Sequence, residues 1–237
     1  MERRRLVPIR LSRRLALAGA ALSCALGLTQ ASPGTASDPV GASAAAPRLQ
    51  ISKRLIPYGA SRQNDMAEYS RRHYGEAVSA LTDPKLIVIH YAEAGDLSSI
   101  FNTFAPNRPD VEYNELPGVC SHYAVGAGGE IVRFVPASIR CRHVVGLNHV
   151  SLGIEHVGFS DGDVLGNKRE LKASLRLTQF LRCREGIGIK QVIGHNESLK
   201  SPYYLELDPD FRGRTHGDFP TSAMRVYRRG LRSLGAC

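Results

Sequence analysis

The amino-acid sequence predicts a single α/β domain in which helices flank a central mixed β-sheet. Short apolar runs rich in β-branched residues alternate with helical patterns along the chain, an order typical of strands and helices layered around one sheet. The sheet is expected to be mixed, because strand-like runs over 122–126 and 131–135 flank Gly128-Gly129, a hairpin signal. About 190 residues follow an amino-terminal leader, enough for one well-buried domain.

The leader has the features of an export signal. Six arginines precede an apolar stretch of 14 residues over 15–28. That stretch is too short to span a bilayer comfortably and is typical of a signal peptide, and the small residues up to Ala31 offer a cleavage site. We therefore expect a signal peptide over 1–31, a flexible linker over 32–50 and the folded domain over 51–237. An uncleaved membrane anchor is the alternative, and the route of export, Sec or twin-arginine, stays open.

The charge of the chain argues against nucleic acid as a partner. The six leader arginines against Glu2 and Asp38 give residues 1–46 a net charge of +4, which leaves +5 of the total +9 for the rest. Such a mildly basic domain suits an acidic polymer such as a cell wall. No segment past residue 50 is apolar enough to cross a membrane. We expect an exported monomer, periplasmic or secreted to the cell wall, without stable membrane insertion once the signal is removed.

The spacing of apolar residues places the elements in order. Helices are expected over 61–81, 98–104 and 170–184 and after residue 220; strands are expected over 85–91, 122–126, 131–135, 151–157 and 191–195. The strand over 85–91 is apolar on both faces and therefore central. The helix over 170–184 is the clearest, since its leucines share one face and Gly186 supplies a stop signal.

Amino-terminal caps are expected for two other helices. Asp96 or Ser98 is expected to cap the helix over 98–104, and Thr221 or Ser222 the last helix. The inward side chains of that last helix are expected to be Ala223, Val226, Tyr227 and Leu234.

Four cysteines follow the leader: Cys120, Cys141, Cys183 and Cys237. An even number in an exported protein permits two disulfides, although connectivity cannot be deduced from sequence alone. We expect Cys120 to pair with Cys141 and Cys183 with Cys237; four buried thiols are the alternative. A zinc–thiolate site is disfavoured, because no two of these cysteines have ligand spacing.

Two histidines and an aspartate stand where ligands of a catalytic metal would be expected. His90 and His195 each end a strand-like run, which carries an imidazole to the rim of the sheet. Asp218 follows in a loop, with His216 and Glu197 as competitors for the same role. Two imidazoles, a carboxylate and one open position would make a catalytic zinc site rather than a closed structural one.

A glutamate inside a strand is the candidate proton carrier. Alternation along 151–157 places Leu152, Ile154 and His156 on one face and Glu155 on the other. A carboxylate amid apolar residues is costly to bury without a partner. Facing a metal cleft, Glu155 could take a proton from an attacking water and pass it to a leaving amine. A structural salt bridge is the alternative.

Five blocks of sequence follow one another in a specific order: 86–91 (LIVIHY), 121–136 (SHYAVGAGGEIVRFVP), 142–146 (RHVVG), 151–155 (SLGIE) and 193–195 (IGH). Together they resemble the zinc-dependent N-acetylmuramoyl-L-alanine amidases, the amidase-2 family related to peptidoglycan recognition proteins. The resemblance covers a core of residues 85–220. It implies a mixed sheet flanked by helices, one catalytic Zn²⁺, and hydrolysis of the amide joining the lactyl group of muramic acid to L-alanine in peptidoglycan or muropeptides.

The resemblance also assigns roles to residues. His90, His195 and Asp218 match the zinc ligands, and Glu155 matches the catalytic glutamate of bacterial members. His216 occupies the place of a usual lysine, where an imidazole could stabilise the oxyanion. Residues expected to bind substrate are Tyr91, His122, Arg142, His143 and Asn148.

Three departures from the family pattern stand out. The stretch from His195 to Asp218 is longer than usual, His216 replaces a lysine, and Ser121 stands where phage and animal relatives have a tyrosine. Arg142 also stands in place of a tryptophan. The absent lysine keeps open a non-catalytic peptidoglycan-binding module of the same fold. Another zinc amidohydrolase, acting on a different amide, is a third possibility.

Overall fold

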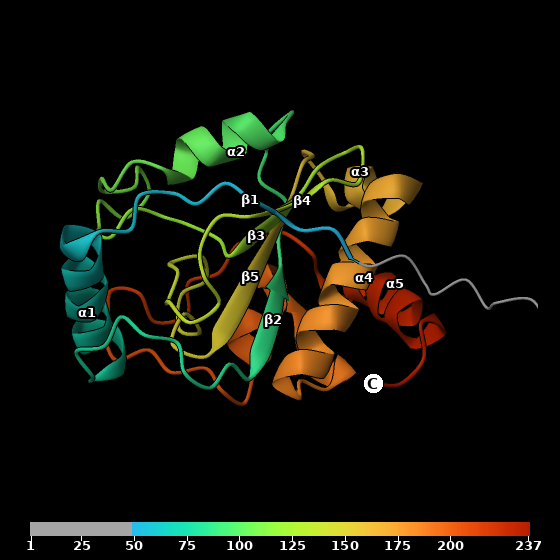
Figure 1. The fold of residues 1–237 in the computed structure, drawn as a ribbon. Helices are drawn as coiled ribbons and strands as arrows, with labels where there is room; N and C mark the ends of the chain where they lie inside the picture. Colours follow the sequence, from blue (N-terminus) through green and yellow to red (C-terminus); the bar gives the residue numbers. More distant parts are fainter. Residues whose placement is uncertain (1–48) are drawn as a thin grey trace, which may run out of the picture. The chain divides into compact units, whose positions relative to one another are not determined.

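The structure is a computed structural model that describes residues 49–237. The expected signal peptide over 1–31 lies outside the described residues, as does the expected linker over 32–50 except for its last two residues. Within the described part, Figure 1 shows a central sheet with α3, α4 and α5 on one side and α1 and α2 on the other. No helix of this part combines the length and apolarity needed to cross a membrane.

The sheet is mixed, as the sequence predicts. Its six strands are β1 (Ser52–Lys53), β2 (Leu86–Ile89), β3 (Tyr123–Val125), β4 (Ile131–Arg133), β5 (Ser151–His156) and β6 (Val192–Gly194), in the spatial order β1-β4-β3-β5-β2-β6. Only the hairpin of β3 and β4 is antiparallel among these pairs. Strands β5, β2 and β6 are therefore parallel neighbours whose carboxyl ends meet at one edge, which positions the site.

Side-chain alternation divides the core between the two faces of the sheet. On β2, Ile87 and Ile89 pack in the cluster that contains Leu177 of α4 and Tyr227 of α5. The alternate residues of β2 pack in a second cluster, on the face that carries residues 144–150. Because all four residues of this strand are fully buried, it is a central strand with no polar face.

The helices are α1 (Ala60–Tyr74), α2 (Leu97–Phe104), α3 (Asp161–Gly166), α4 (Lys168–Glu185) and α5 (Thr221–Ser233). Helix α1 ends before the expected boundary at residue 81, because Gly75 adopts a left-handed φ of 78°. Asp96 caps α2, accepting a hydrogen bond from the Ser99 amide at 2.7 Å, and Gly186 ends α4 as expected. Helix α3, which has no sequence prediction, is capped by Ser160.

Two expectations for the last helix are wrong. Pro220 occupies the N-cap of α5 and no side chain caps it, so neither Thr221 nor Ser222 has that role. Val226 and Leu234 are 48% and 45% exposed rather than inward. The buried face consists of Ala223, Met224, Tyr227 and Leu231.

Both expected disulfides are present. Cys120–Cys141 and Cys183–Cys237 join Cα atoms 5.4 and 5.2 Å apart. The first holds the segment before β3 against the segment that leads into His143. The second ties α4 to the carboxyl terminus.

Candidate functional site

The parallel strands bring two histidines together. Ile89 of β2 is in register with Gly194 of β6. His90 and His195 are the next residues of the two segments, so both imidazoles emerge at the carboxyl edge of the sheet. Their ring centroids lie 4.7 Å apart, and both side chains are buried. The strand ends expected from the sequence therefore place these two side chains side by side.

Asp218 reaches the histidines from an irregular loop. The Asn196 amide donates to the Asp218 carbonyl oxygen at 2.9 Å, and the Phe219 amide donates to Asp161 Oδ1 at 2.7 Å. Phe219 packs directly on Gly194, where a Cβ would lie 1.8 Å from the Phe219 carbonyl oxygen. These contacts hold the backbone on both sides of Asp218 against the end of β6.

The three side chains converge on one point. Asp218 Oδ2 lies 3.1 Å from His90 Nδ1, and Asp218 Oδ1 lies 3.2 Å from His195 Nδ1. One ligand atom from each residue lies within 4.8 Å of the others, and all three residues are buried. Two imidazole nitrogens and a carboxylate fit a zinc ion with a position left for water or substrate. The donor set therefore suits the metal that the sequence predicts.

The competing ligands lie elsewhere. Glu197 accepts two hydrogen bonds from Arg228, at 2.7 and 2.8 Å. His216 stacks on His195 with ring centroids 4.7 Å apart, and its Nε2 faces Glu112 Oε2 at 2.9 Å. His216 thus lies beside the three converging residues without joining them.

Electrostatics keep Asp218 and His195, two of the three convergent groups, in forms suited to a cation. Burial raises the pKa of Asp218, but its contacts with the imidazoles of His195 and His90 outweigh burial and hold that pKa below its ordinary range. Burial lowers the pKa of His195 to about 4, despite the hydrogen bond to Asp218. Burial also lowers the pKa of His90, but the charges of Glu155 and Asp218 outweigh it and raise the pKa. A carboxylate and a neutral imidazole are the ligand forms that zinc requires.

Glu155 is buried beside this group without a salt bridge. It is 8% exposed, and its Oε2 has no hydrogen-bond partner. Burial raises its pKa to about 7, against the lowering effect of His90 and with a further rise from Asp218. A carboxyl group at the wall of a cleft, with a pKa near neutral pH, suits general acid–base chemistry. The salt-bridge alternative has no cationic partner among the described contacts of Glu155.

A cavity of about 340 Å³ is lined by the three convergent residues together with Glu155 and His216. His90, His195, Asp218 and Glu155 form one part of its wall, and Tyr91 lies beside them. Further wall residues come from Tyr69 of α1, from α2, and from parts of the segments 119–120, 110–113, 142–148 and 211–217. The candidate metal centre therefore opens into a cleft large enough to take part of a ligand.

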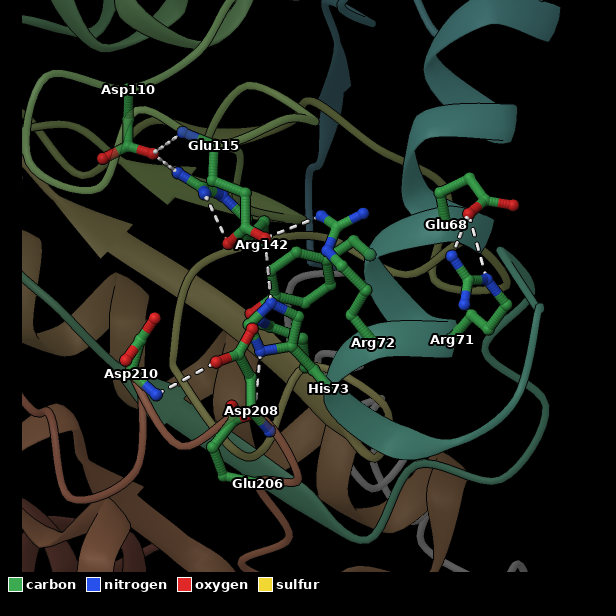
Figure 2. A network of polar contacts seen from close by, with 12 residues as sticks. Glu68, Arg71, Arg72, His73, Asp110, Glu115, Arg142, Glu206, Asp208 and Asp210 are labelled. Atoms are coloured by element: carbon green, nitrogen blue, oxygen red, sulfur yellow. Dashed lines mark hydrogen bonds and ion pairs between the residues drawn. The ribbon is translucent and has the colours of Figure 1, made fainter.

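Arg142 lines this cavity, but its guanidinium is already paired. It is 5% exposed, contacts Asp110, and has an NH1 atom 3.6 Å from Glu115. Glu115 also accepts from Arg72 at 2.6 Å and faces His73 at 3.0 Å, as Figure 2 shows. Arg142 is thus part of a polar network that joins α1 to the cleft wall.

The side chains of Asn148 and His122 also form hydrogen bonds within the protein. Asn148 Oδ1 accepts from the amides of His143 and Val144, both at 2.8 Å. His122 is fully buried, accepts from the Gly153 amide at 3.0 Å and bonds the Ile139 carbonyl oxygen at 2.9 Å. The structure does not bring His122 to the cavity wall. His143 does line the cavity, where its Nδ1 lies 3.0 Å from His90 Nε2.

Two loops meet at the rim of the cleft in a way that sequence reasoning missed. Besides the contact of Glu112 with His216, Tyr113 packs on Phe211 with ring centroids 5.2 Å apart. Arg214 lies over Tyr113, 5.0 Å from the ring centroid. Both loops lack apolar periodicity, so no sequence signal could pair them.

Comparisons with known proteins agree with this architecture. The sequence model described as N-acetylmuramoyl-L-alanine amidase matches residues 80–209, more than half of the chain. A mutant endolysin from Bacillus subtilis is 18% identical, with a TM-score of 0.50, over 78% of this chain and 99% of that one. This likeness shows the fold. No curated protein matches the chain.

Two further solved structures are similar at lower TM-scores. The N-acetylmuramoyl-L-alanine amidase LysC from Clostridium intestinale URNW is 14% identical, with a TM-score of 0.45, over 75% of this chain and 95% of that one. The E. coli amidase AmiD, solved with a muropeptide, is 24% identical, with a TM-score of 0.38, over 48% of this chain and 49% of that one.

Proposed function

This chain belongs to the N-acetylmuramoyl-L-alanine amidase family, and from that premise we propose that it is an exported, zinc-dependent member. The proposed reaction is hydrolysis of the amide between the lactyl group of muramic acid and L-alanine, in peptidoglycan or a soluble muropeptide. The observation that carries the proposal is the convergence of His90, His195 and Asp218, with Glu155 buried beside them, on the wall of one cavity.

His90, His195 and Asp218 are the residues proposed to hold one zinc ion. The ion would supply Lewis-acid chemistry for attack of water on the amide. Two neutral imidazoles and one carboxylate leave a net positive charge with a divalent cation. With such an ion bound, the site would favour negative charge on the scissile carbonyl oxygen.

Glu155 is proposed to move the proton. Its ionised carboxylate accepts a proton from the attacking water, and the resulting carboxylic acid donates it to the departing alanine nitrogen. A pKa of about 7 serves both steps, because the group can be ionised before attack and protonated before departure.

His216 is proposed to stabilise the oxyanion in place of a lysine. The stack on His195 and the contact with Glu112 fix its ring at the rim of the same cavity. Tyr91 and His143 on the cavity wall are candidates to contact substrate. Arg142 and Asn148 are each bonded to other protein groups, so we assign them to the support of that wall.

The test combines a cleavage assay with metal analysis. The purified protein is incubated with a soluble muropeptide, and release of a free alanine amino terminus is measured. We expect cleavage by the zinc-loaded protein, loss after zinc removal, recovery on zinc addition, and a kcat about 10²–10⁴-fold lower for Glu155→Gln. Full activity after verified zinc removal would contradict the metal role.

The absent lysine gives one alternative its weight: a peptidoglycan-binding module without catalysis. Binding of the muropeptide by zinc-loaded wild type, without any alanine amino terminus appearing, would favour that module. Amino-terminal sequencing of the exported protein tests the proposed signal peptide over 1–31. Size-exclusion chromatography with light scattering tests the proposed monomer.

A further inference from the structure

We propose that His143 is a positioning residue that fixes the imidazole of His90 for metal binding. The proposal rests on the zinc-dependent function above and goes beyond it, because it gives His143 a role toward a metal ligand in addition to its place on the cavity wall. The observation behind it is a chain of three hydrogen bonds that runs from His90 through His143 and Ser151 to a backbone carbonyl.

The donor and acceptor of each hydrogen bond can be assigned by starting from the backbone carbonyl at the end of the chain. The Leu147 carbonyl oxygen can only accept, so the Ser151 hydroxyl donates to it at 2.8 Å. The Ser151 oxygen then accepts from His143 Nε2, 3.3 Å away. A neutral imidazole that donates from Nε2 has its lone pair on Nδ1. His143 Nδ1 therefore accepts from His90 Nε2 at 3.0 Å.

This assignment decides the tautomer of His90. With its proton on Nε2, His90 presents the lone pair of Nδ1, the atom that lies 3.1 Å from Asp218 Oδ2. That nitrogen faces the point where His195 Nδ1 also converges. A ligating histidine gains orientation and basicity when its other nitrogen donates to a fixed acceptor. His143 supplies that acceptor.

The protein holds His143 rigidly enough for this role. The amides of His143 and Val144 both donate to Asn148 Oδ1 at 2.8 Å, and Asn148 Nδ2 donates to the Tyr69 hydroxyl at 3.1 Å. The disulfide Cys120–Cys141 lies two residues before His143. These contacts fix the backbone from which the ring projects.

Strand β5 leaves room for the ring at one position. Ser151, Gly153 and Glu155 alternate along the strand toward the same side. A Cβ on Gly153 would lie 2.9 Å from His143 Nδ1 and 3.0 Å from its Cε1. Glycine at 153 thus lets the imidazole lie against the strand, between Ser151, which accepts its hydrogen bond, and Glu155, which faces the cleft.

The experiment measures zinc affinity by competition with a chromophoric chelator, using the purified full-length protein. We expect His143→Ala to weaken zinc binding about 10–100-fold, as loss of a hydrogen-bond partner of a metal ligand does. His143→Asn should recover most of this loss, because its side-chain oxygen can accept from His90 Nε2. Ser151→Ala should weaken binding by a smaller factor. Circular dichroism and cooperative thermal unfolding without metal establish that each variant folds.

His149→Ala is the matched control. His149 lies in the same segment and is also half-buried, but it makes no hydrogen bond to the three proposed ligands. We expect its zinc affinity to stay within about threefold of wild type. Zinc affinity unchanged in His143→Ala, with a raised KM, would overturn the inference and assign His143 to substrate. If His143→Ala does not fold, a zinc affinity of Ser151→Ala no weaker than that of the His149→Ala control would overturn the inference. Absence of zinc binding by wild type would instead overturn the proposed function itself.

Discussion

Gly194 and Phe219 lie in direct contact, so close that a Cβ on Gly194 would stand 1.8 Å from the Phe219 carbonyl oxygen and 2.6 Å from the Phe219 Cβ. Each of these residues is the chain neighbour of a proposed zinc ligand, His195 in one case and Asp218 in the other. The absence of a side chain at 194 therefore lets the loop that carries Asp218 close onto the end of β6. The geometry of the candidate metal centre depends on this approach.

The first prediction follows from that contact. Gly194→Ala should force the loop away from β6, weaken zinc binding at least tenfold and lower the free energy of unfolding by about 1–3 kcal/mol, as overpacking does. Zinc titration and thermal unfolding measure the two effects. Gly217→Ala is the control, because a Cβ there meets no atom within 4 Å although the residue also adjoins Asp218. Equal behaviour of the two variants would show that the contact does not position the ligand.

The second prediction concerns the oxyanion. His216→Ala should lower kcat about 10²-fold, the loss typical of removing one oxyanion donor, with a smaller effect on KM. His216→Lys restores the residue usual in the family and should keep most of the activity. Steady-state kinetics with a soluble muropeptide measure both values. A wild-type kcat in His216→Ala would remove this residue from the proposed mechanism.

The third prediction is a pH dependence of stability centred on His73. This fully buried imidazole faces Glu206 at 2.8 Å and Glu115 at 3.0 Å (Figure 2). Burial lowers its pKa, but the two carboxylates outweigh burial and raise the pKa above the ordinary value. The stabilisation is therefore fully present below about pH 6.5, the unfolded value, and is lost as pH rises through the folded pKa.

Glu115 limits the same stabilisation at low pH. Burial raises its pKa, but hydrogen bonds from His73 and Arg72 outweigh it and lower the pKa, so its stabilisation is lost as pH falls through the folded value. Urea unfolding from pH 4 to 9 should show His73→Ala costing about 3 kcal/mol near pH 6, and less at higher pH. Arg71→Gln, which breaks an exposed pair with Glu68 on the same helix, should cost less than about 1 kcal/mol at every pH. A pH-independent effect of His73→Ala would refute the prediction.

The fourth prediction separates stability from function. Replacing Cys183 and Cys237 together by alanine should lower the free energy of unfolding by about 2–5 kcal/mol, because this disulfide closes a long loop between α4 and the carboxyl terminus. We expect zinc affinity to stay within about twofold of wild type, since neither cysteine lines the cavity. Denaturant unfolding and zinc titration report the two quantities. A parallel fall in zinc affinity would mean that α4 and α5 also support the site.

Local pattern in the sequence was enough to predict the layered fold and part of the site. The apolar runs ending at His90 and His195 indicate strands, and parallel strands present their carboxyl ends at one edge. The alternation along 151–157 places Glu155 opposite Leu152 and Ile154, and the structure shows the same division. These features depend only on the period of the side chains along a strand, which sequence records directly.

The end of α5 and the polar residues of the cleft wall could not be predicted in the same way. Val226 and Leu234 are apolar yet exposed, because α4 and β6 cover only one face of that helix. Arg142 has the charge of a substrate-binding residue, yet it is neutralised by Asp110, 32 residues away in sequence. Partners that are distant along the chain leave no periodic signal near either residue.

By itself, the sequence determined the mixed α/β fold, both histidines at the sheet edge and the glutamate that faces them, since each follows from local side-chain periodicity. Only the tertiary structure decided that Asp218, rather than Glu197 or His216, converges on those histidines, and that His143 bonds His90. The physical reason is that loop positions depend on long-range contacts, such as Gly194 against Phe219 and Asn196 against Asp218. Such contacts form only when separate segments pack together.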